Sequence, residues 1–244
     1  MATPGLFLCC WSSPRAAGAL RSQGEGCKAP TGSPITFALR RRARHHVNPL
    51  GGKFLDTQAV RVASRQRPVE VELGCADARF LFERAPLHPD CDFVGVEIRQ
   101  PLVETVNEIA AERGLANLRA VFANITTELD ILFADASLER VFVNFPDPWF
   151  KQRHAKRRLM TAELARTIAD KLVPGGELLF QSDIWTLGIE AMAVLEGEPS
   201  LLNTQGTWSF LRDNPYDAKS LREVRVEEDG VRVWRLLYAR AGTV

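Results

Sequence analysis

The sequence lacks a Cys-x-x-Cys pair and any grouping of cysteine and histidine at the spacing of a zinc site. Cys9, Cys10 and Cys27 lie in the first 40 residues, which leaves Cys75 and Cys91 for the folded part. We therefore expect no metal site and no disulfide framework, and we expect a reducing compartment. No run approaches the roughly 18 to 20 apolar residues that a membrane-spanning helix needs. A membrane is consequently not an expected partner.

Acidic residues are scarce in one region, residues 1–40, where Glu25 stands against four cations. This segment is rich in alanine, serine, glycine and proline, which is typical of an organelle transit peptide, although a plain disordered tail has a similar composition. We predict a disordered transit peptide over residues 1–40, a basic arm over residues 41–60 and the folded domain over residues 61–244. Because the formal charge of the whole chain is only +1, a polyanion has to bind at a local cationic patch.

Glycine is absent between Gly74 and Gly95, so the dinucleotide-binding fingerprint is missing. The residue pattern predicts a strand over 69–73, which meets Gly74 before a helix begins. The next predicted strand, 93–97, ends in Glu97, 23 residues after Gly74. Rossmann-type folds place there the carboxylate that accepts the ribose hydroxyls, and a surface ion pair is the alternative role. Because a pyrophosphate needs several glycines, the pattern favours S-adenosylmethionine over NAD as the cofactor.

Later segments extend the same alternation of strand and helix. A predicted strand over 117–124 ends in Asn124, whose amide suits either an adenine or an ordinary turn. A helix over 159–172 stops at a Pro-Gly-Gly sequence. The strand that follows, 177–181, then delivers Asp183 to the same edge of the sheet as the earlier strand ends.

The end of the sequence predicts an antiparallel hairpin. Strands over 224–226 and 231–238 flank an acidic turn that contains Gly230. With the earlier units, this gives an α/β, Rossmann-like fold with a mostly parallel sheet and a C-terminal antiparallel hairpin. That is the architecture of class I S-adenosylmethionine-dependent methyltransferases.

The stretch over 141–158 places one acid, Asp147, between two prolines. The strand over 141–143 must end there, because neither a helix nor a strand ladder continues through Pro146 and Pro148. Six basic residues follow: Lys151, Arg153, His154, Lys156, Arg157 and Arg158. Ligands of open α/β sheets bind beyond the carboxyl ends of the strands, so this arrangement indicates a nucleotide site. An ordinary turn with a solvated basic face is the alternative.

Five segments together carry a more specific pattern: LGCADARF, DFVGVEIR, FVNFPDPWFKQRHAKRR, PGGELLFQSDI and SLREVRV. Over about residues 47–240 they resemble the TrmB-type tRNA (guanine-N7-)-methyltransferases. The resemblance implies methyl transfer from S-adenosyl-L-methionine to a guanosine of tRNA, which forms 7-methylguanosine. The segment HVNPL and the GCA form of the first turn are most similar to the cyanobacterial and plastid branch. With the leading segment, they predict the chloroplast stroma, and a mitochondrion or the cytoplasm is the alternative. By the same analogy we expect a monomer or homodimer without an obligatory protein partner.

The resemblance also implies the roles of individual residues. The cofactor-binding set is Glu72, Gly74, Glu97, Asn124 and Asp147, and Asp147 is also the catalytic residue. The substrate-binding set is Lys151, Asp183, Ser220, Leu221, Arg222 and Glu223. The remaining basic residues are implied to contact tRNA: Arg153, His154, Lys156, Arg157 and Arg158.

Two departures from the family pattern bear on these roles. Ala78 stands where glycine is usual, and we expect an alanine there to need an ordinary backbone conformation and so to weaken cofactor binding. Ser220 keeps the hydroxyl of the usual threonine, whereas Leu221 is apolar where a polar residue is common. Three other functions stay open from the residues alone. They are a class I methyltransferase acting on a protein or small molecule, a catalytically silent RNA-binding homologue, and an NAD-dependent enzyme, which the missing glycines disfavour.

Overall fold

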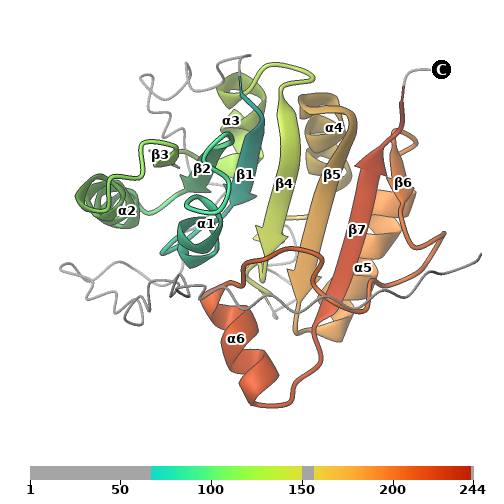
Figure 1. Ribbon diagram of the computed structural model, residues 1–244. Helices are drawn as coiled ribbons and strands as arrows, with labels where there is room; N and C mark the ends of the chain where they lie inside the picture. The colour runs from blue at the N-terminus through green and yellow to red at the C-terminus, as the bar shows by residue number, and fades with distance from the viewer. Residues whose placement is uncertain (1–66, 150–156, 243–244) are drawn as a thin grey trace, which may run out of the picture. The chain divides into compact units, whose positions relative to one another are not determined.

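Residues 67–149 and 157–242 are described by the structure, a computed structural model (Figure 1). The predicted transit peptide and basic arm lie outside these residues. So do four members of the basic run: Lys151, Arg153, His154 and Lys156.

Helices and strands alternate along the described chain. Their bounds, in chain order, are β1 (Val69–Leu73), α1 (Arg79–Arg84), β2 (Asp92–Glu97), α2 (Gln100–Glu112), β3 (Leu118–Phe122), α3 (Ile125–Leu132), β4 (Leu138–Asn144), α4 (Ala162–Lys171), β5 (Leu172–Ser182), α5 (Trp185–Glu196), β6 (Leu201–Asn203), α6 (Leu221–Glu228) and β7 (Trp234–Arg240). The described strands form one sheet in the order β3-β2-β1-β4-β5-β7-β6. β1 to β5 pair in parallel, whereas β7 is antiparallel to both β5 and β6. The predicted mostly parallel, Rossmann-like sheet with antiparallel C-terminal strands is confirmed.

The central strands are covered on both faces, as parallel strands usually are. Along β4, Val141 and Val143 belong to the core cluster that includes Ile168 of α4. Phe142 points to the opposite face because side chains alternate along a strand, and its ring lies 4.7 Å, centroid to centroid, from that of Phe80 on α1. Figure 1 accordingly shows α1 in front of the sheet and α4 and α5 behind it. Burial of both faces fixes the register of the strands. Because β1 to β5 are parallel, their carboxyl ends lie at one edge of the sheet.

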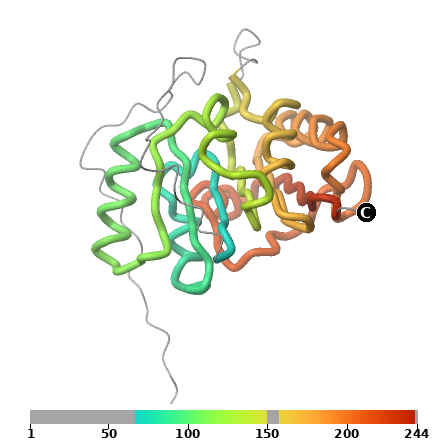
Figure 2. The backbone as a smooth tube through the Cα atoms, turned by 90° about the horizontal axis from the view of Figure 1, so that it is seen from above, coloured from blue at the N-terminus to red at the C-terminus, as the bar shows by residue number. Residues whose placement is uncertain are grey.

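The two ends of the sheet carry different helices. Viewed from above, α2 (green) and α5 (orange) lie at opposite ends of the sheet (Figure 2). This agrees with the strand order, in which β3 is one outer strand and β6 the other. The edge formed by the carboxyl ends of β1, β2, β4 and β5 lies between them.

The first strand of the predicted C-terminal hairpin, 224–226, is wrong, because these residues form a helix. Residues 224–226 belong to α6, because Ser220 caps that helix by accepting a hydrogen bond from the backbone N–H of Glu223 at 3.1 Å. A serine followed three residues later by glutamate is the capping-box signature of a helix start. The second predicted strand is present as β7, which pairs with β5 and with the short strand β6.

Candidate active site

The structure gathers the strand-end acids of the sequence at the carboxyl edge of the sheet. Glu72 is near the end of β1 and pairs in register with Gly95 of β2 and Phe142 of β4. Glu97 ends β2, and Asp147 follows β4 by three residues. Because these strands are parallel neighbours, their carboxylates share one edge.

Glu72 is buried, and one of its carboxylate oxygens is unsatisfied. Asn144 donates a side-chain hydrogen bond to Oε1 at 2.8 Å, whereas Oε2 is buried without a hydrogen-bond partner among the described residues. Burial raises the pKa of Glu72 to about 8 against the effect of the Asn144 hydrogen bond, and the negative charges of Asp77 and Glu97 raise it further. A buried acid of this kind is stabilised in its charged form by a positively charged ligand.

Glu97 is buried rather than on the surface, and its carboxylate organises the first turn. The backbone N–H of Ala76 donates to Oε2 at 3.0 Å. Arg99 donates to Oε1 from its backbone N at 2.9 Å and from Nε at 2.8 Å, and to Oε2 from Nη2 at 2.8 Å. Glu97 therefore accepts four hydrogen bonds, which matches the roughly four lone-pair sites of a carboxylate.

The turn between β1 and α1 contains two alanines in the left-handed region. Gly74 has φ of 79°, and Ala76 and Ala78 have φ of 50° and 53°. The expectation that Ala78 requires an ordinary backbone conformation is wrong. The turn is imposed by its hydrogen bonds, from the N–H groups of Gly74 and Cys75 to the carbonyl of Val96 at 2.8 and 3.2 Å. The alanines bear the conformational cost that glycine would avoid.

Asn124 follows β3 and caps α3. Its side chain accepts a hydrogen bond from the backbone N–H of Thr126 at 3.1 Å, and its own backbone N–H donates to the carboxylate of Glu128 at 2.7 Å. The residue is buried. Its helix-capping role accounts for the Oδ1 contact and fixes the amide at this edge of the sheet.

Asp147 is exposed beside the Glu97 and Arg99 pair. Hydrogen bonding to Glu97 raises the pKa of Arg99, and the negative charge of Asp147 contributes to the same shift. The loop that carries Asp147 is held at its start, where the backbone N–H of Phe145 donates to the carbonyl of Gln181 at 2.8 Å. Asp147 therefore lies on the same side of the edge as the buried acids.

The start of the basic run is outside the described residues, but its end lies near this loop. The Arg157 guanidinium carbon is 4.9 Å from the centre of the Trp149 ring. Arg158 pairs with Glu190 of α5. The two arginines therefore connect the Asp147 loop with the first helix after β5.

The predicted substrate stretch on α6 divides into exposed and buried side chains. Arg222 is exposed and forms an ion pair with Asp183, so the structure brings these two predicted residues together. Leu221 is half-buried, and the Ser220 hydroxyl is used in the helix cap. Glu223 is fully buried and pairs with Arg235 within the protein, and its contact with substrate stays a prediction.

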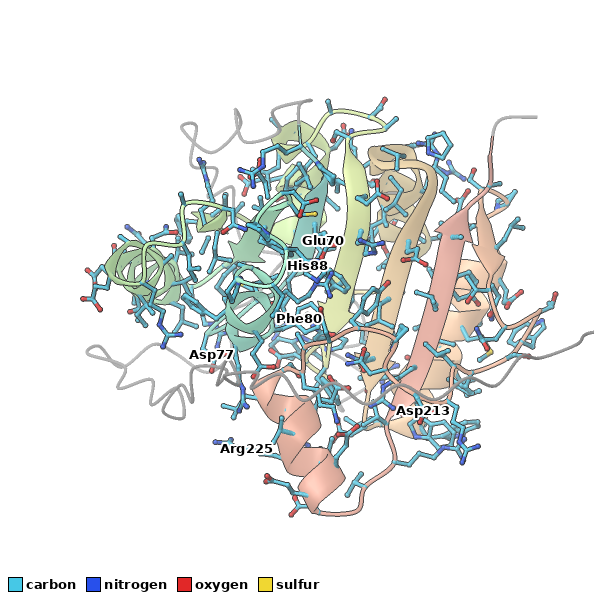
Figure 3. All side chains as sticks on the ribbon, viewed as in Figure 1. Glu70, Asp77, Phe80, His88, Asp213 and Arg225 are labelled. Atoms are coloured by element: carbon cyan, nitrogen blue, oxygen red, sulfur yellow. The ribbon has the colours of Figure 1, made fainter. Side chains whose placement is uncertain are left out.

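α6 faces the cofactor turn. The positive charge of Arg225 acts on Asp77, whose pKa is raised chiefly by burial. Figure 3 shows both residues beyond the carboxyl ends of the strands, whereas Glu70 and His88 lie closer to the amino ends. The turn and α6 thus border the same edge of the sheet.

Four residues at this edge were missed by the sequence analysis: Arg99, Asn144, Gln181 and Arg235. Arg99 and Asn144 are adjacent to predicted elements, and a polar residue at a strand end was the signal available for them. Gln181 also ends a predicted strand, but its contact with Arg235 depends on the pairing of β5 with β7, for which the local sequence gave no signal. The described residues contain no helix that is long and apolar enough to cross a bilayer. They also contain no group of three or more His, Cys, Asp or Glu placed to hold a metal.

The described sheet has the class I methyltransferase fold, with buried acids at its carboxyl edge. Among solved structures, the 16S rRNA methyltransferase KamB matches with a TM-score of 0.53 and 14% identity, over 78% of this chain and 95% of that one. A 16S rRNA (adenine(1408)-N(1))-methyltransferase from Catenulisporales acidiphilia matches with a TM-score of 0.50 and 17% identity, over 77% and 90% of the two chains. These similarities support the fold alone.

Sequence relatives are more specific. Residues 66–236 match the family described as "Putative methyltransferase". A tRNA (guanine-N(7)-)-methyltransferase of Synechococcus elongatus is 39% identical, over 82% of this chain and 97% of the relative. One of Synechocystis sp. is 41% identical, over 76% and 90%. The chain belongs to the tRNA (guanine-N(7)-)-methyltransferase family.

Proposed function

We propose that this chain transfers the methyl group of S-adenosyl-L-methionine to nitrogen 7 of a guanosine in tRNA. The observation that carries the proposal is 39% identity over 97% of a relative that bears this name. The local chemistry supports it, because Glu72, Glu97 and Asp147 share the edge at which open α/β sheets bind ligands.

The residues at this edge fit the cofactor. The buried Oε2 of Glu72 lacks a hydrogen-bond partner among the described residues, and an ammonium group would satisfy it. Glu97 would accept ribose hydroxyls only after Arg99 gives up part of its pairing, because the carboxylate already accepts four hydrogen bonds. Asn124 would border the adenine. When bound, S-adenosylmethionine supplies an electrophilic methyl group on a sulfonium.

Asp147 is proposed as the catalytic residue through orientation rather than proton removal. Nitrogen 7 of guanine has an in-plane lone pair and no proton, so no general base is needed. Asp147 would accept hydrogen bonds from the guanine edge and offset the positive charge that methylation leaves on the ring. Correct placement of two bound partners is worth on the order of 7 to 11 kcal/mol at best.

Binding of tRNA is assigned to the basic run and α6. A base in structured RNA has to be turned out of its stack to reach such a pocket. Lys151 would contact the guanosine. The phosphates would be held by Arg153, His154, Lys156, Arg157 and Arg158. Asp183 and Arg222, which pair with each other, would contact the guanosine at the opposite side of the edge.

The direct test uses the purified chain from about Arg41, unmodified tRNA and cofactor labelled in the methyl group. Nucleoside analysis should find the label in 7-methylguanosine. Label in another nucleoside would contradict the proposed specificity. If the protein binds the cofactor but transfers no methyl group to tRNA, the proposed function is rejected.

We further propose a plastid location without an obligatory protein partner. The acid-poor leading segment and the cyanobacterial relatives support the location. A fluorescent protein fused after residue 60 should enter chloroplasts, and import into mitochondria would contradict the proposal. Sedimentation of the active chain would separate a monomer from a homodimer.

A further inference from the structure

Buried and half-buried polar side chains form a continuous row across the carboxyl edge of the sheet. This polar row consists of Glu72 on β1, Asn144 on β4, Gln181 on β5, Arg235 on β7 and Glu223 on α6. Asn144 donates to Glu72 at 2.8 Å, and Gln181 Nε2 donates to Asn144 Oδ1 at 2.9 Å. Gln181 Nε2 also donates to Glu223 at 3.3 Å, while Arg235 donates to Gln181 at 2.8 Å and to Glu223 at 2.8 Å. The row therefore joins the proposed cofactor carboxylate to the helix of the proposed substrate stretch.

Gln181 is the junction of this row. It pairs in register with Asn144 on one side and with Arg235 on the other. Its Nε2 faces two acceptors and its Oε1 faces a donor, so exchanging the oxygen and nitrogen would oppose like groups. The side chain is fully buried. Its amide is therefore held in one orientation by contacts from three sides.

Arg235 fixes α6 to the sheet at two points. Its Nη2 donates to Glu223 at 2.8 Å and to Glu227 at 2.7 Å, one helical turn apart. Glu223 is also the residue whose backbone N–H is capped by Ser220. A shift of the Gln181–Glu223–Arg235 contacts would therefore move the start of α6, which carries Arg222.

The other end of the row is Glu72, whose carboxylate would be contacted by a bound ligand. Glu72 has one oxygen bonded to Asn144 and one without a partner among the described residues. A cation at that oxygen favours the carboxylate, and hydrogen bonds to a charged acceptor are shorter and stronger than neutral ones. The Asn144 contact would tighten, and Asn144 in turn contacts Gln181.

We propose that Gln181 is a positioning residue that couples the cofactor site at Glu72 to α6, so that cofactor and tRNA bind cooperatively. The proposal rests on the proposed function and deepens it. Coupling between two sites in one protein is commonly about 5- to 150-fold in affinity. We expect S-adenosylhomocysteine, which keeps the ammonium group, to raise tRNA affinity at least about fivefold.

The test measures tRNA binding with and without saturating S-adenosylhomocysteine, in wild type, Gln181→Leu, Gln181→Glu and Tyr238→Phe. Tyr238→Phe is the matched control, because it removes a part-buried 2.8 Å hydrogen bond to Glu196 on the far side of the same sheet. Both Gln181 variants should lose the enhancement to within about twofold, while Tyr238→Phe keeps it.

Three results would overturn the proposal: no enhancement in wild type, full enhancement in a folded Gln181 variant, or equal loss in Tyr238→Phe. If neither Gln181 variant folds, hydrogen exchange of residues 221–228 in wild type decides. The cofactor product should slow exchange there, and unchanged exchange counts against coupling. Because wild-type methyl transfer is measured first, failure of the proposed function stays distinguishable from failure of the coupling.

Discussion

Glu72→Gln should remove a specific pH dependence from the stability of the ligand-free protein. The pKa of Glu72 is raised from its ordinary 4.5 to about 8, chiefly by burial. Between these values the folded state binds more protons than the unfolded state, so stability falls as pH rises. The stabilising contribution is fully present below about pH 4.5 and is lost as pH approaches and passes 8.

The magnitude follows from the two pKa values. Between pH 5 and pH 7.5 the linkage amounts to about 3 kcal/mol for a single group with this shift. Glutamine has the same shape and can still accept the Asn144 hydrogen bond through its side-chain oxygen, but it cannot ionise. The free energy of unfolding should therefore fall by about 3 kcal/mol more in wild type than in Glu72→Gln over this range.

Urea denaturation of both proteins at pH 5, 6, 7 and 7.5 measures the difference directly. Parallel loss of stability in the two proteins would refute the raised pKa. Calorimetry gives a second measure, because a cation that binds to the carboxylate must displace its proton. At pH 7 wild type should release close to one proton per cofactor bound. The Glu72→Gln variant, with weaker affinity, should not show that release.

The remaining predictions concern the turn, the catalytic acid and the basic run. Ala76→Gly should raise the free energy of unfolding by about 0.5 to 1 kcal/mol, because relief of left-handed strain exceeds the entropy cost of glycine; lower stability in thermal unfolding would show that the turn is not strained. Asp147→Ala should abolish methyl transfer while leaving the circular dichroism and melting temperature unchanged, and near wild-type turnover would exclude the proposed role. Arg157→Ala should reduce the salt slope of tRNA binding by about 1. Arg158→Ala should do so less, since Arg158 already pairs with Glu190; binding titrations at several salt concentrations would reject this if the order were reversed.

The parallel part of the fold could be predicted from local sequence because each signal was local. Alternation of valine with glutamate marked β1, and short apolar runs marked β2 and β4. Gly74, Glu97 and Pro146 marked the points where these strands ended. Parallel pairing then required these ends to share one edge. The acids at that edge could be found in the same way, since Glu72, Glu97 and Asp147 each belong to a strand end.

α6 was mispredicted because two periods fit the same residues. The sequence VRVEE alternates like a strand, but Val226 is buried on a helix whose other face is exposed. The serine and glutamate three residues apart, Ser220 and Glu223, were the helix signal that outweighed the alternation. A helix-cap signal such as Ser220 and Glu223 should therefore count as much as apolar periodicity when a helix or strand is predicted.

The polar row could not be predicted, because it depends on which strands become neighbours. β5 and β7 are separated by more than fifty residues, and Gln181 meets Arg235 only through their antiparallel register. A buried glutamine and a buried arginine each look unfavourable in isolation, since an unpaired polar group in the interior is costly. They become compatible with a core only as partners.

The two buried acids at the carboxyl edge differ in how their charge is balanced, and this difference assigns their tasks. Glu97 is bonded to Arg99 and to the backbone of Ala76, so its charge is balanced within the protein and it holds the turn. Glu72 has only the neutral amide of Asn144, and its second oxygen has no partner among the described residues. An acid that is already balanced changes little when a cation arrives, whereas an unbalanced one changes its charge state. A response to the cofactor should therefore start at Glu72, and the polar row begins at that residue.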